Sequence, residues 1–438
     1  MKNKEIAKDF TKYVSLNIFS QLAYSFYTMA DTFFVSRDLG TNSLTALNLA
    51  FPIFCVINGL GLMIGIGGGS RYTIYKSQND DKKANIVFTN AIYISVFFSI
   101  IFFLLGLFCS GPIVRFLGAD DVIFDMANTY LKTMLLFSPA FILNSTLVSF
   151  VRNDGGPTYS TTAMIISSVS NIILDYIFIY PLNMGIFGAI LATGLSPIIS
   201  IAVLSLFFIK RKNKFSFIKT KLTEEIYKIS STGITPLITE LTSGVVMFLF
   251  NMIILKLNGN IGVAAFGIVS VIMLAVTAIY NGLSQGIQPI LSINYGIKNK
   301  DNIKFIFKYA ILTSFIISII LYSIIYFKAN FIQSIFNSEQ DIELQTLAIR
   351  GLKLYFIACP FVGINVVLAT YFLTTNNVLK SQLISLLRGF IILIPTSIIL
   401  SILLKIDGVY LSYLVSEFIV SIIGVTFLII SKKKKNDC

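Results

Sequence analysis

Long apolar runs are the feature that most constrains this chain. Runs of about 20 residues or more, each long enough to cross the hydrocarbon core of a bilayer as a helix, recur along the whole sequence. Their expected bounds are 12–36, 46–71, 86–109, 126–150, 160–181, 186–209, 229–256, 261–292, 305–327, 347–372, 380–404 and 408–430. Since no long hydrophilic segment lies outside them, we expect an all-α integral membrane protein with twelve transmembrane helices.

The composition and the placement of charge support this expectation. The residues are 55% hydrophobic and only 13% charged, whereas a soluble domain carries about 25% charged residues. The formal net charge of +13 comes mostly from Lys and Arg at the N-terminus, in 71–83, 210–228 and 298–308, and in the terminal "KKKK". These segments fall on one side of the predicted spans, so the positive-inside rule places both termini in the cytoplasm. We therefore expect a multi-pass protein of the cell (plasma or inner) membrane and no nucleic-acid partner.

The sequence also matches itself at an offset of about 220 residues. The stretch "LLFSPAFILNSTLVSF" aligns with "FIACPFVGINVVLATYF", which places Asn144 opposite Asn365, and "GLMIGIGG" aligns with "GLSQGIQP". An offset that holds along the whole chain indicates two related halves of six helices. We expect an N-terminal lobe of residues 1–215 and a C-terminal lobe of residues 216–438.

The number of helices in each half fixes how the halves are related. Because six is even, both halves enter and leave the membrane on the same side, as parallel repeats related by a pseudo-twofold axis along the membrane normal do. Transporters built in this way bind substrate between their halves and move one half against the other. The duplication therefore favours a carrier, with a channel as the alternative from another class.

Polar side chains recur at helical spacing inside several apolar runs. The stripes are Asn17, Gln21, Tyr24, Thr28 and Asp31; Ser167, Asn171 and Asp175; Glu240, Ser243, Met247 and Asn251; and Asn281, Gln285, Gln288 and Ser292. Hydrogen bonding between helices is the ordinary explanation for a single Ser or Asn, whereas continuous stripes that end in carboxylates favour a water-filled central cavity. The side chains expected to contact a substrate there are Gln21, Tyr24, Asn144, Glu240, Met247, Gln285 and Gln288.

Four acids lie inside the predicted spans, and they carry more information than the amides. They are Asp31, Asp175, Glu240 and Glu417. An acid at the centre of a membrane helix costs roughly 2.5–3.5 kcal/mol on insertion scales and usually marks an ion or substrate pathway. None of the four has an acidic counterpart at the repeat offset. The scaffold is duplicated but the acids are not, which indicates specialised sites.

Asp31 and Asp175 belong to the same half of the sequence. Two carboxylates in a medium of low dielectric constant resist double ionisation. They can take up a proton, or bind a small cation through oxygen ligands. We therefore predict that this pair couples transport to an ion, with Na⁺ and H⁺ both open. For Glu417, pairing with Arg388 of the preceding span is the favoured interpretation.

Several classes of chemistry lack the residues they need. The chain contains no His, which excludes Ser-His-Asp and Cys-His arrangements and His-ligated metals. The glycine-rich "GIGGGSR" lacks the Lys of a P-loop and sits in a predicted span, so close helix packing explains it. We expect neither an enzyme nor ATP-driven transport, no cofactor beyond the coupling ion, and no metal site other than one for Na⁺ at the acid pair.

Four stretches carry a family resemblance: "MADTFFVSRDLGTNSLTALNLAFPI", "FVRNDGGPTYS", "NIILDYIFIYPLNMGIFGAILAT" and "GLSQGIQPILSINYGIKN". They resemble the multidrug and toxic compound extrusion (MATE) family over nearly the whole chain, and the last two resemble its MepA-like drug exporters. The resemblance implies a MATE-type fold of two six-helix lobes. It also implies a cation-coupled antiporter that exports amphipathic, often cationic compounds by alternating access.

The resemblance further implies roles for particular residues. The family's cation site uses an Asp of the first helix, an Asn and an Asp four residues apart in the fifth, and a Thr of the sixth. These fall on Asp31, Asn171, Asp175 and Thr193, and the family's Glu after a Pro in the seventh helix falls on Glu240.

Two further family features bear on this chain. The family's Arg-Asn-Asp-Gly loop falls on residues 152–155, where a structural role and a gating role are both open. Some members carry an additional Asp in the tenth helix, but this chain has Asn365 there and no acid. The resemblance therefore does not imply a cation site in the C-terminal lobe.

The nearest rival function within the same superfamily is a flippase for lipid-linked saccharides. Such a protein needs basic residues in its central cavity to hold a pyrophosphate, and no Lys or Arg lies on the polar stripes. We therefore favour small amphipathic molecules as substrates, and we expect a monomer whose only other partner is the lipid bilayer.

Overall fold

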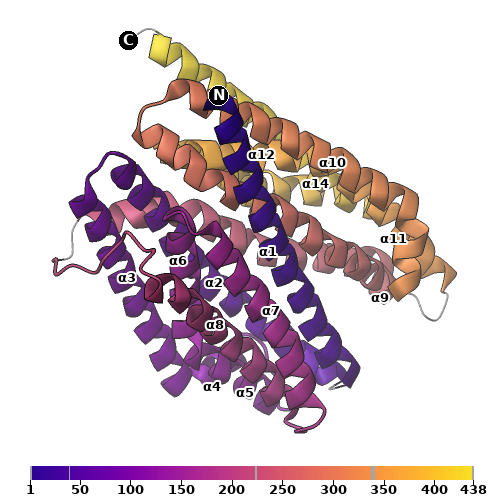
Figure 1. Ribbon diagram of the computed structural model, residues 1–438. Coiled ribbons are helices and arrows are strands. Elements are labelled where there is room, and N and C mark those ends of the chain that lie inside the picture. Colours follow the sequence, from indigo (N-terminus) through magenta and orange to yellow (C-terminus); the bar gives the residue numbers. More distant parts are fainter. Residues whose placement is uncertain (1, 39, 222–223, 337–340, 437–438) are drawn as a thin grey trace. The chain divides into compact units, whose positions relative to one another are not determined.

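The computed structural model describes residues 2–38, 40–221, 224–336 and 341–436 (Figure 1). These residues form helices joined by short connections, and no strand occurs among them. The first part of the chain contains α1 (Lys2–Asp38), α2 (Gly40–Ser77), α3 (Asp81–Phe108), α4 (Ser110–Phe116), α5 (Phe124–Leu136), α6 (Ser138–Asn153), α7 (Pro157–Ile179) and α8 (Gly185–Ile209).

The remaining helices follow a linker, residues 210–224, whose described residues form neither helix nor strand. They are α9 (Glu225–Gly296), α10 (Lys300–Phe336), α11 (Ile342–Tyr355), the 3₁₀ turn η1 (Phe356–Ala358), α12 (Cys359–Thr374), α13 (Val378–Leu386), the π-helical turn η2 (Leu387–Ile391) and α14 (Leu393–Asn436).

The helices account for the predicted membrane spans. Eight described helical segments are long and apolar enough to cross a membrane, or nine if α5 and α6, which meet at a 45° bend, form one span. Two of these segments contain a break at a residue with positive φ: α9 breaks at Gly259, and the segment Val378–Ser431, which includes most of α14, breaks at Lys405. With α1, which covers the predicted span 12–36 but is not among these segments, the described helices account for the twelve predicted spans. The predicted all-α membrane fold is confirmed.

The duplication is visible in the backbone as well as in the sequence. Residues with positive φ recur in pairs about 220 positions apart: Asn79 and Lys298, Gly155 and Asn376, and Gly185 and Lys405. Left-handed backbone is uncommon for residues other than glycine, so its recurrence at matching positions is specific. The same turns therefore separate corresponding helices in both halves.

The structure divides into two compact units. The N-terminal unit comprises Thr11–Leu241 and Ser292–Asn299, and the C-terminal unit comprises Met1–Phe10, Thr242–Leu291 and Lys300–Cys438. This division falls inside α9, because the first turns of α9 pack tightly on α2. A Cβ added to Gly233 would overlap the carbonyl oxygen of Met63, and one added to Gly67 would overlap that of Ile229. The predicted division into lobes of residues 1–215 and 216–438 stays a prediction.

The core of the N-terminal unit includes an aromatic cluster that holds the linker after α8. Phe215 of the linker is 2% exposed. Its ring centroid lies 4.4 Å from that of Phe88 on α3, 5.9 Å from that of Tyr72 on α2 and 6.0 Å from that of Phe150 on α6. Such edge-on and tilted contacts add to the stabilisation from burial. The linker is therefore anchored where it leaves α8.

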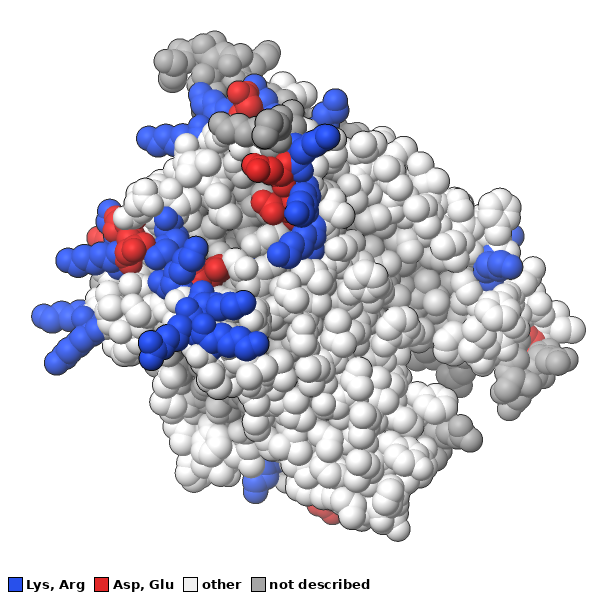
Figure 2. Space-filling view, viewed as in Figure 1, with Lys and Arg blue, Asp and Glu red and all other residues white. Residues whose placement is uncertain are grey.

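Large apolar side chains cover much of the outer surface. Examples with more than a third of their area exposed are Phe97, Ile100, Leu104, Ile316, Ile320 and Ile324 on α3 and α10. In Figure 2 most of the visible surface is neither acidic nor basic. Extended exposed apolar surface of this kind indicates contact with lipid.

Candidate functional site

The four residues expected to bind the coupling ion come from three helices of the N-terminal unit. Asp31 lies on α1, Asn171 and Asp175 lie on α7, and Thr193 lies on α8. All four side chains are buried. The helices α7 and α8 are joined by five residues, 180–184, and such short connections make consecutive helices antiparallel neighbours.

Asn171 links the acid of its own helix to the neighbouring helix. Of the two possible orientations of its side-chain amide, one makes a hydrogen bond to each neighbour. In this orientation Nδ2 donates to Oδ2 of Asp175 at 3.1 Å, and the amide oxygen accepts from the backbone N–H of Thr193 at 3.3 Å. The first contact follows from the spacing of four residues, which puts Asn171 and Asp175 on one face of α7. The structure therefore brings Asn171, Asp175 and Thr193 together.

The two acids lie within electrostatic range of each other. Oδ1 of Asp31 and Oδ1 of Asp175 are both buried, and neither has a hydrogen-bond partner among the described residues. Buried polar atoms without a partner are uncommon in folded proteins. Carboxylate, amide and hydroxyl oxygens are the ligands that hard cations prefer, and two adjacent carboxylates also hold a proton readily. The arrangement thus fits a small monovalent cation or a shared proton.

Two tyrosines near this acid pair were not predicted from the sequence. Tyr27 on α1 and Tyr130 on α5 both interact electrostatically with Asp31 and with Asp175. Tyr27 stands four residues before Asp31, a spacing that could have indicated it. No spacing rule connects Tyr130 to either acid, because it comes from another helix.

A second acidic site in the N-terminal unit surrounds Glu240 on α9. Asn58 of α2 donates from Nδ2 to Oε2 of Glu240 at 3.2 Å, and Tyr24 and Cys55 lie within electrostatic range of the same carboxylate. The structure therefore joins two of the predicted substrate residues, Tyr24 and Glu240. Asn58 was not predicted from the sequence, although an amide inside the apolar run 46–71 is itself a signal of a polar contact.

The other predicted substrate residues divide between the two units. Gln21 on α1 is buried, and Asn144 on α6 has a buried Oδ1 without a hydrogen-bond partner in the described part of the chain. Met247, Gln285 and Gln288 lie on the part of α9 that belongs to the C-terminal unit, where both glutamines are buried. That all seven residues line one cavity stays a prediction.

The predicted pairing of Glu417 with Arg388 is confirmed. Nη2 and Nε of Arg388 donate to Oε1 of Glu417 at 2.8 and 3.0 Å. Nδ2 of Asn365 donates to Oε2 at 2.7 Å, so both oxygens of this carboxylate have partners.

The loop at residues 152–155 ties several segments of the N-terminal unit together. Nη1 of Arg152 donates to Oδ1 of Asn17 at 2.8 Å. Asp154 accepts from the hydroxyl of Tyr72 at 2.6 Å and from the backbone N–H of Lys214 at 2.5 Å. Burial raises the pKa of the Asp154 carboxyl above its usual range. These contacts give the loop a structural role in joining α1, α2 and the linker, while a gating role stays a prediction.

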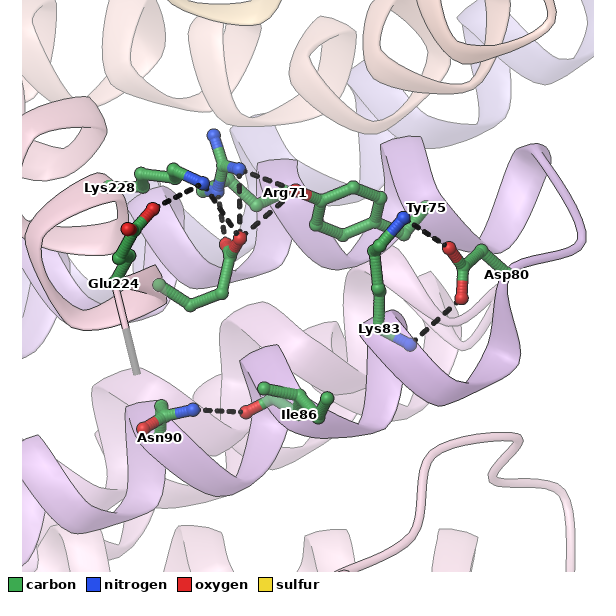
Figure 3. A network of polar contacts seen from close by, with 9 residues as sticks. Arg71, Tyr75, Asp80, Lys83, Ile86, Asn90, Glu224 and Lys228 are labelled. Atoms are coloured by element: carbon green, nitrogen blue, oxygen red, sulfur yellow. Dashed lines mark hydrogen bonds and ion pairs between the residues drawn. The ribbon is translucent and has the colours of Figure 1, made fainter. Parts of the chain in front are cut away.

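A network of charged groups joins α2 to the start of α9 (Figure 3). Nε of Arg71 lies 2.8 Å from Oε2 of Glu225. The hydroxyl of Tyr75 donates to Oε1 of Glu225 at 3.0 Å, and Nζ of Lys228 lies 3.4 Å from the same oxygen. The side chains of Arg71 and Glu225 are only 14% and 12% exposed, so this pair is better shielded from solvent than a surface ion pair.

Helical spans in two repeated halves, with acids buried inside the spans, are typical of multi-pass membrane transporters. The MatE family model matches residues 17–177 and 236–399, so the chain belongs to the MatE family, whose members are transporters and not enzymes.

Curated relatives cover nearly the whole chain. Multidrug export protein MepA of Staphylococcus saprophyticus is 26% identical over 396 residues, which span 90% of this chain and 87% of the relative. Multidrug export protein MepA of Staphylococcus aureus is also 26% identical, over 398 residues that span 89% of this chain and 86% of the relative. The predicted likeness to MepA-like exporters is confirmed.

Solved structures share the fold. A multidrug resistance MATE family transporter of the MOP superfamily, in its outward-facing conformation, superposes with a TM-score of 0.92 at 22% identity, covering 98% of this chain and 97% of that chain. A MOP superfamily transporter from Pyrococcus furiosus, described as having a binding pocket of reverse polarity, superposes with a TM-score of 0.90 at 22% identity, covering 96% and 95%.

Proposed function

We propose that this chain is a cation-coupled antiporter that exports amphipathic, mainly cationic drugs and toxic compounds by alternating access. The observation that carries the proposal is the buried pair Asp31 and Asp175, each with an oxygen that lacks a partner. The curated relatives, named multidrug export proteins, support the substrate class.

Coupling follows from the charge at the acid pair. Uptake of Na⁺ or H⁺ by Asp31 and Asp175 removes repulsion between α1 and α7, and its release restores that repulsion. A ligand shifts a conformational equilibrium only by its differential affinity for the two states. The coupling ion therefore drives export if it binds one access state better and the substrate binds the other better.

Glu240 supplies the chemistry for a cationic substrate. Its carboxylate lies near Tyr24, and an acid beside an aromatic ring attracts a cation through charge and through the cation–π interaction. The flippase alternative is not favoured, because Arg388, a base deep in a predicted span, is already paired with Glu417.

The distribution of Lys and Arg supports a location in the plasma membrane with both termini in the cytoplasm. On the surface of the N-terminal unit, Lys76 forms an ion pair with Asp81 and Lys83 forms one with Asp80. Both pairs lie at the turn between α2 and α3, which we place on the cytoplasmic side. We propose a monomer without a nucleic-acid partner.

The test is efflux of a cationic dye from vesicles that contain the purified protein. A sodium gradient and a pH gradient are imposed separately. We expect one of them to drive efflux by the unchanged protein and neither to drive efflux by Asp175→Asn or Asp31→Asn. The double variant should be little worse than either single variant, because residues that act as a unit are not additive.

Asp125→Asn is the matched control, since Asp125 is an exposed acid in the first turn of α5. It should keep full activity. Full gradient-driven efflux by Asp175→Asn would contradict the proposal and leave Asp175 with a structural role. Efflux that neither gradient drives in the unchanged protein would contradict antiport itself.

A further inference from the structure

The ion pair of the C-terminal unit has no role in the proposed function so far. Glu417 is 1% exposed and the side chain of Arg388 is 15% exposed. Arg388 donates twice to one oxygen of the carboxylate and Asn365 donates to the other. The pair is electrically neutral, and the carboxylate has no free oxygen with which to bind a further cation.

The acid pair of the N-terminal unit has the opposite character. Asp31 and Asp175 each keep one buried oxygen without a partner, and no Lys or Arg forms an ion pair with either acid in the described part of the chain. Two acids without a base make a site whose negative charge is compensated only by a cation or a proton taken from solution.

The two sites lie on corresponding helices of the duplicated sequence. At the offset of 220, Tyr413 falls opposite Thr193, and Glu417 stands four residues after Tyr413. Arg388 falls opposite Ser168, one helical turn before Asn171. The C-terminal unit thus carries a base and an acid on the two helices where the N-terminal unit carries Asn171, Asp175 and Thr193.

The backbone around Arg388 departs from a regular α-helix. The N–H of Ile392 donates to the carbonyl of Leu387 at 3.0 Å, which gives the π-helical turn η2. π-helical turns inside α-helices often occur at functional sites. A Cβ added to Gly389 would overlap the side chain of Thr242 on α9, so the turn packs closely on α9.

We propose that Arg388 is a resident cation of the C-terminal unit. Its guanidinium permanently supplies the positive charge that the N-terminal unit takes from solution, so each transport cycle exchanges a cation at Asp31 and Asp175 alone. Arginine suits this role because it stays protonated in proteins. The inference rests on the proposed function, in which those two acids bind the coupling ion.

The test uses the Asp31→Asn/Asp175→Asn protein, in which the acid pair has lost its charge and no longer takes up a cation or a proton. Its thermal unfolding is followed in detergent with sodium chloride or choline chloride, at acidic and at neutral pH. We expect that adding Arg388→Gln makes the unfolding temperature rise by several degrees with sodium or with acid. A buried carboxylate that has lost its partner must take a cation or a proton, and a ligand that binds only the folded state raises its stability.

Two further variants identify the charge as the cause. Arg388→Lys keeps a positive charge and should show no new dependence on sodium or acid. Glu417→Gln, combined with Arg388→Gln, removes the acid and should abolish the new dependence. If Arg388→Gln folds only in this combination, the pair acts through charge compensation, which supports the proposal.

An unchanged dependence on sodium and pH after Arg388→Gln would overturn the proposal. So would a failure of the neutral double variant to fold, because the pair would then be needed for more than its charge. The unfolding measurements do not require transport. A lack of gradient-driven efflux by the unchanged protein would therefore count against the proposed function and not against this inference.

Discussion

At the residue scale, the buried acids differ in what their oxygens contact. Both oxygens of Glu417 accept hydrogen bonds, and one oxygen of Glu240 accepts from Asn58. Asp31 and Asp175 each leave one buried oxygen without a partner in the described part of the chain. Because a buried polar atom without a partner costs about 1–3 kcal/mol, we infer that the acid pair is retained for an exchangeable ligand.

Glu240→Gln should weaken export of cationic dyes more than export of neutral ones. The amide keeps the shape of the side chain and removes the charge that attracts a cation. We expect a loss on the order of tenfold in apparent affinity for a cationic dye, equivalent to about 1.4 kcal/mol. Efflux assays with matched cationic and neutral dyes measure this, and Glu343→Gln on the exposed face of α11 is the control. Equal loss for both dyes would assign Glu240 to coupling or folding.

At the element scale, the contact between α2 and the first turns of α9 depends on glycine. The backbones of the two helices meet at Gly67 and Gly233, as small residues allow in membrane helix packing. About one helical turn after Gly67, Arg71 forms an ion pair with Glu225, the first residue of α9, so the pair joins the same two helices. The first turns of α9 therefore belong to the N-terminal unit, although they follow the linker.

Gly233→Ala should lower the stability of the folded protein. The added methyl group would overlap the backbone of Met63, and overpacking costs about 1–3 kcal/mol. Gly267→Ala, in the part of α9 that follows the break at Gly259, is the control, because nothing lies within 4 Å of the added Cβ. Thermal unfolding in detergent should show a lower transition temperature for Gly233→Ala alone, and equal transitions for both variants would contradict the close approach.

At the scale of the whole molecule, the sidedness of the spans determines the direction of export. Single cysteines in a cysteine-free protein test it in intact cells. Leu182→Cys, in the exposed turn between α7 and α8, should react with an impermeant maleimide from outside. Lys212→Cys, exposed in the linker after α8, should react only after permeabilisation. The reverse pattern would overturn the proposed topology. Ser338, another position expected outside, lies beyond the described residues.

The sequence by itself determined the spans, their number and the duplication. The length of an apolar run sets whether a helix crosses the bilayer, and matching stretches such as "GLMIGIGG" and "GLSQGIQP" reveal the duplication. The pairing of Arg388 with Glu417 was also within reach, because few charged partners are available inside the spans.

The tertiary structure alone decided which helices contribute to each site. Tyr130 joins the acid pair, Asn58 joins Glu240, and Asn365 completes the partners of Glu417, each from a helix that no spacing rule connects to its acid. The first turns of α9 likewise pack with α2 because two glycines let the backbones meet. Periodicity reports which face of a helix is polar, but the neighbour of that face is set by how all the helices pack.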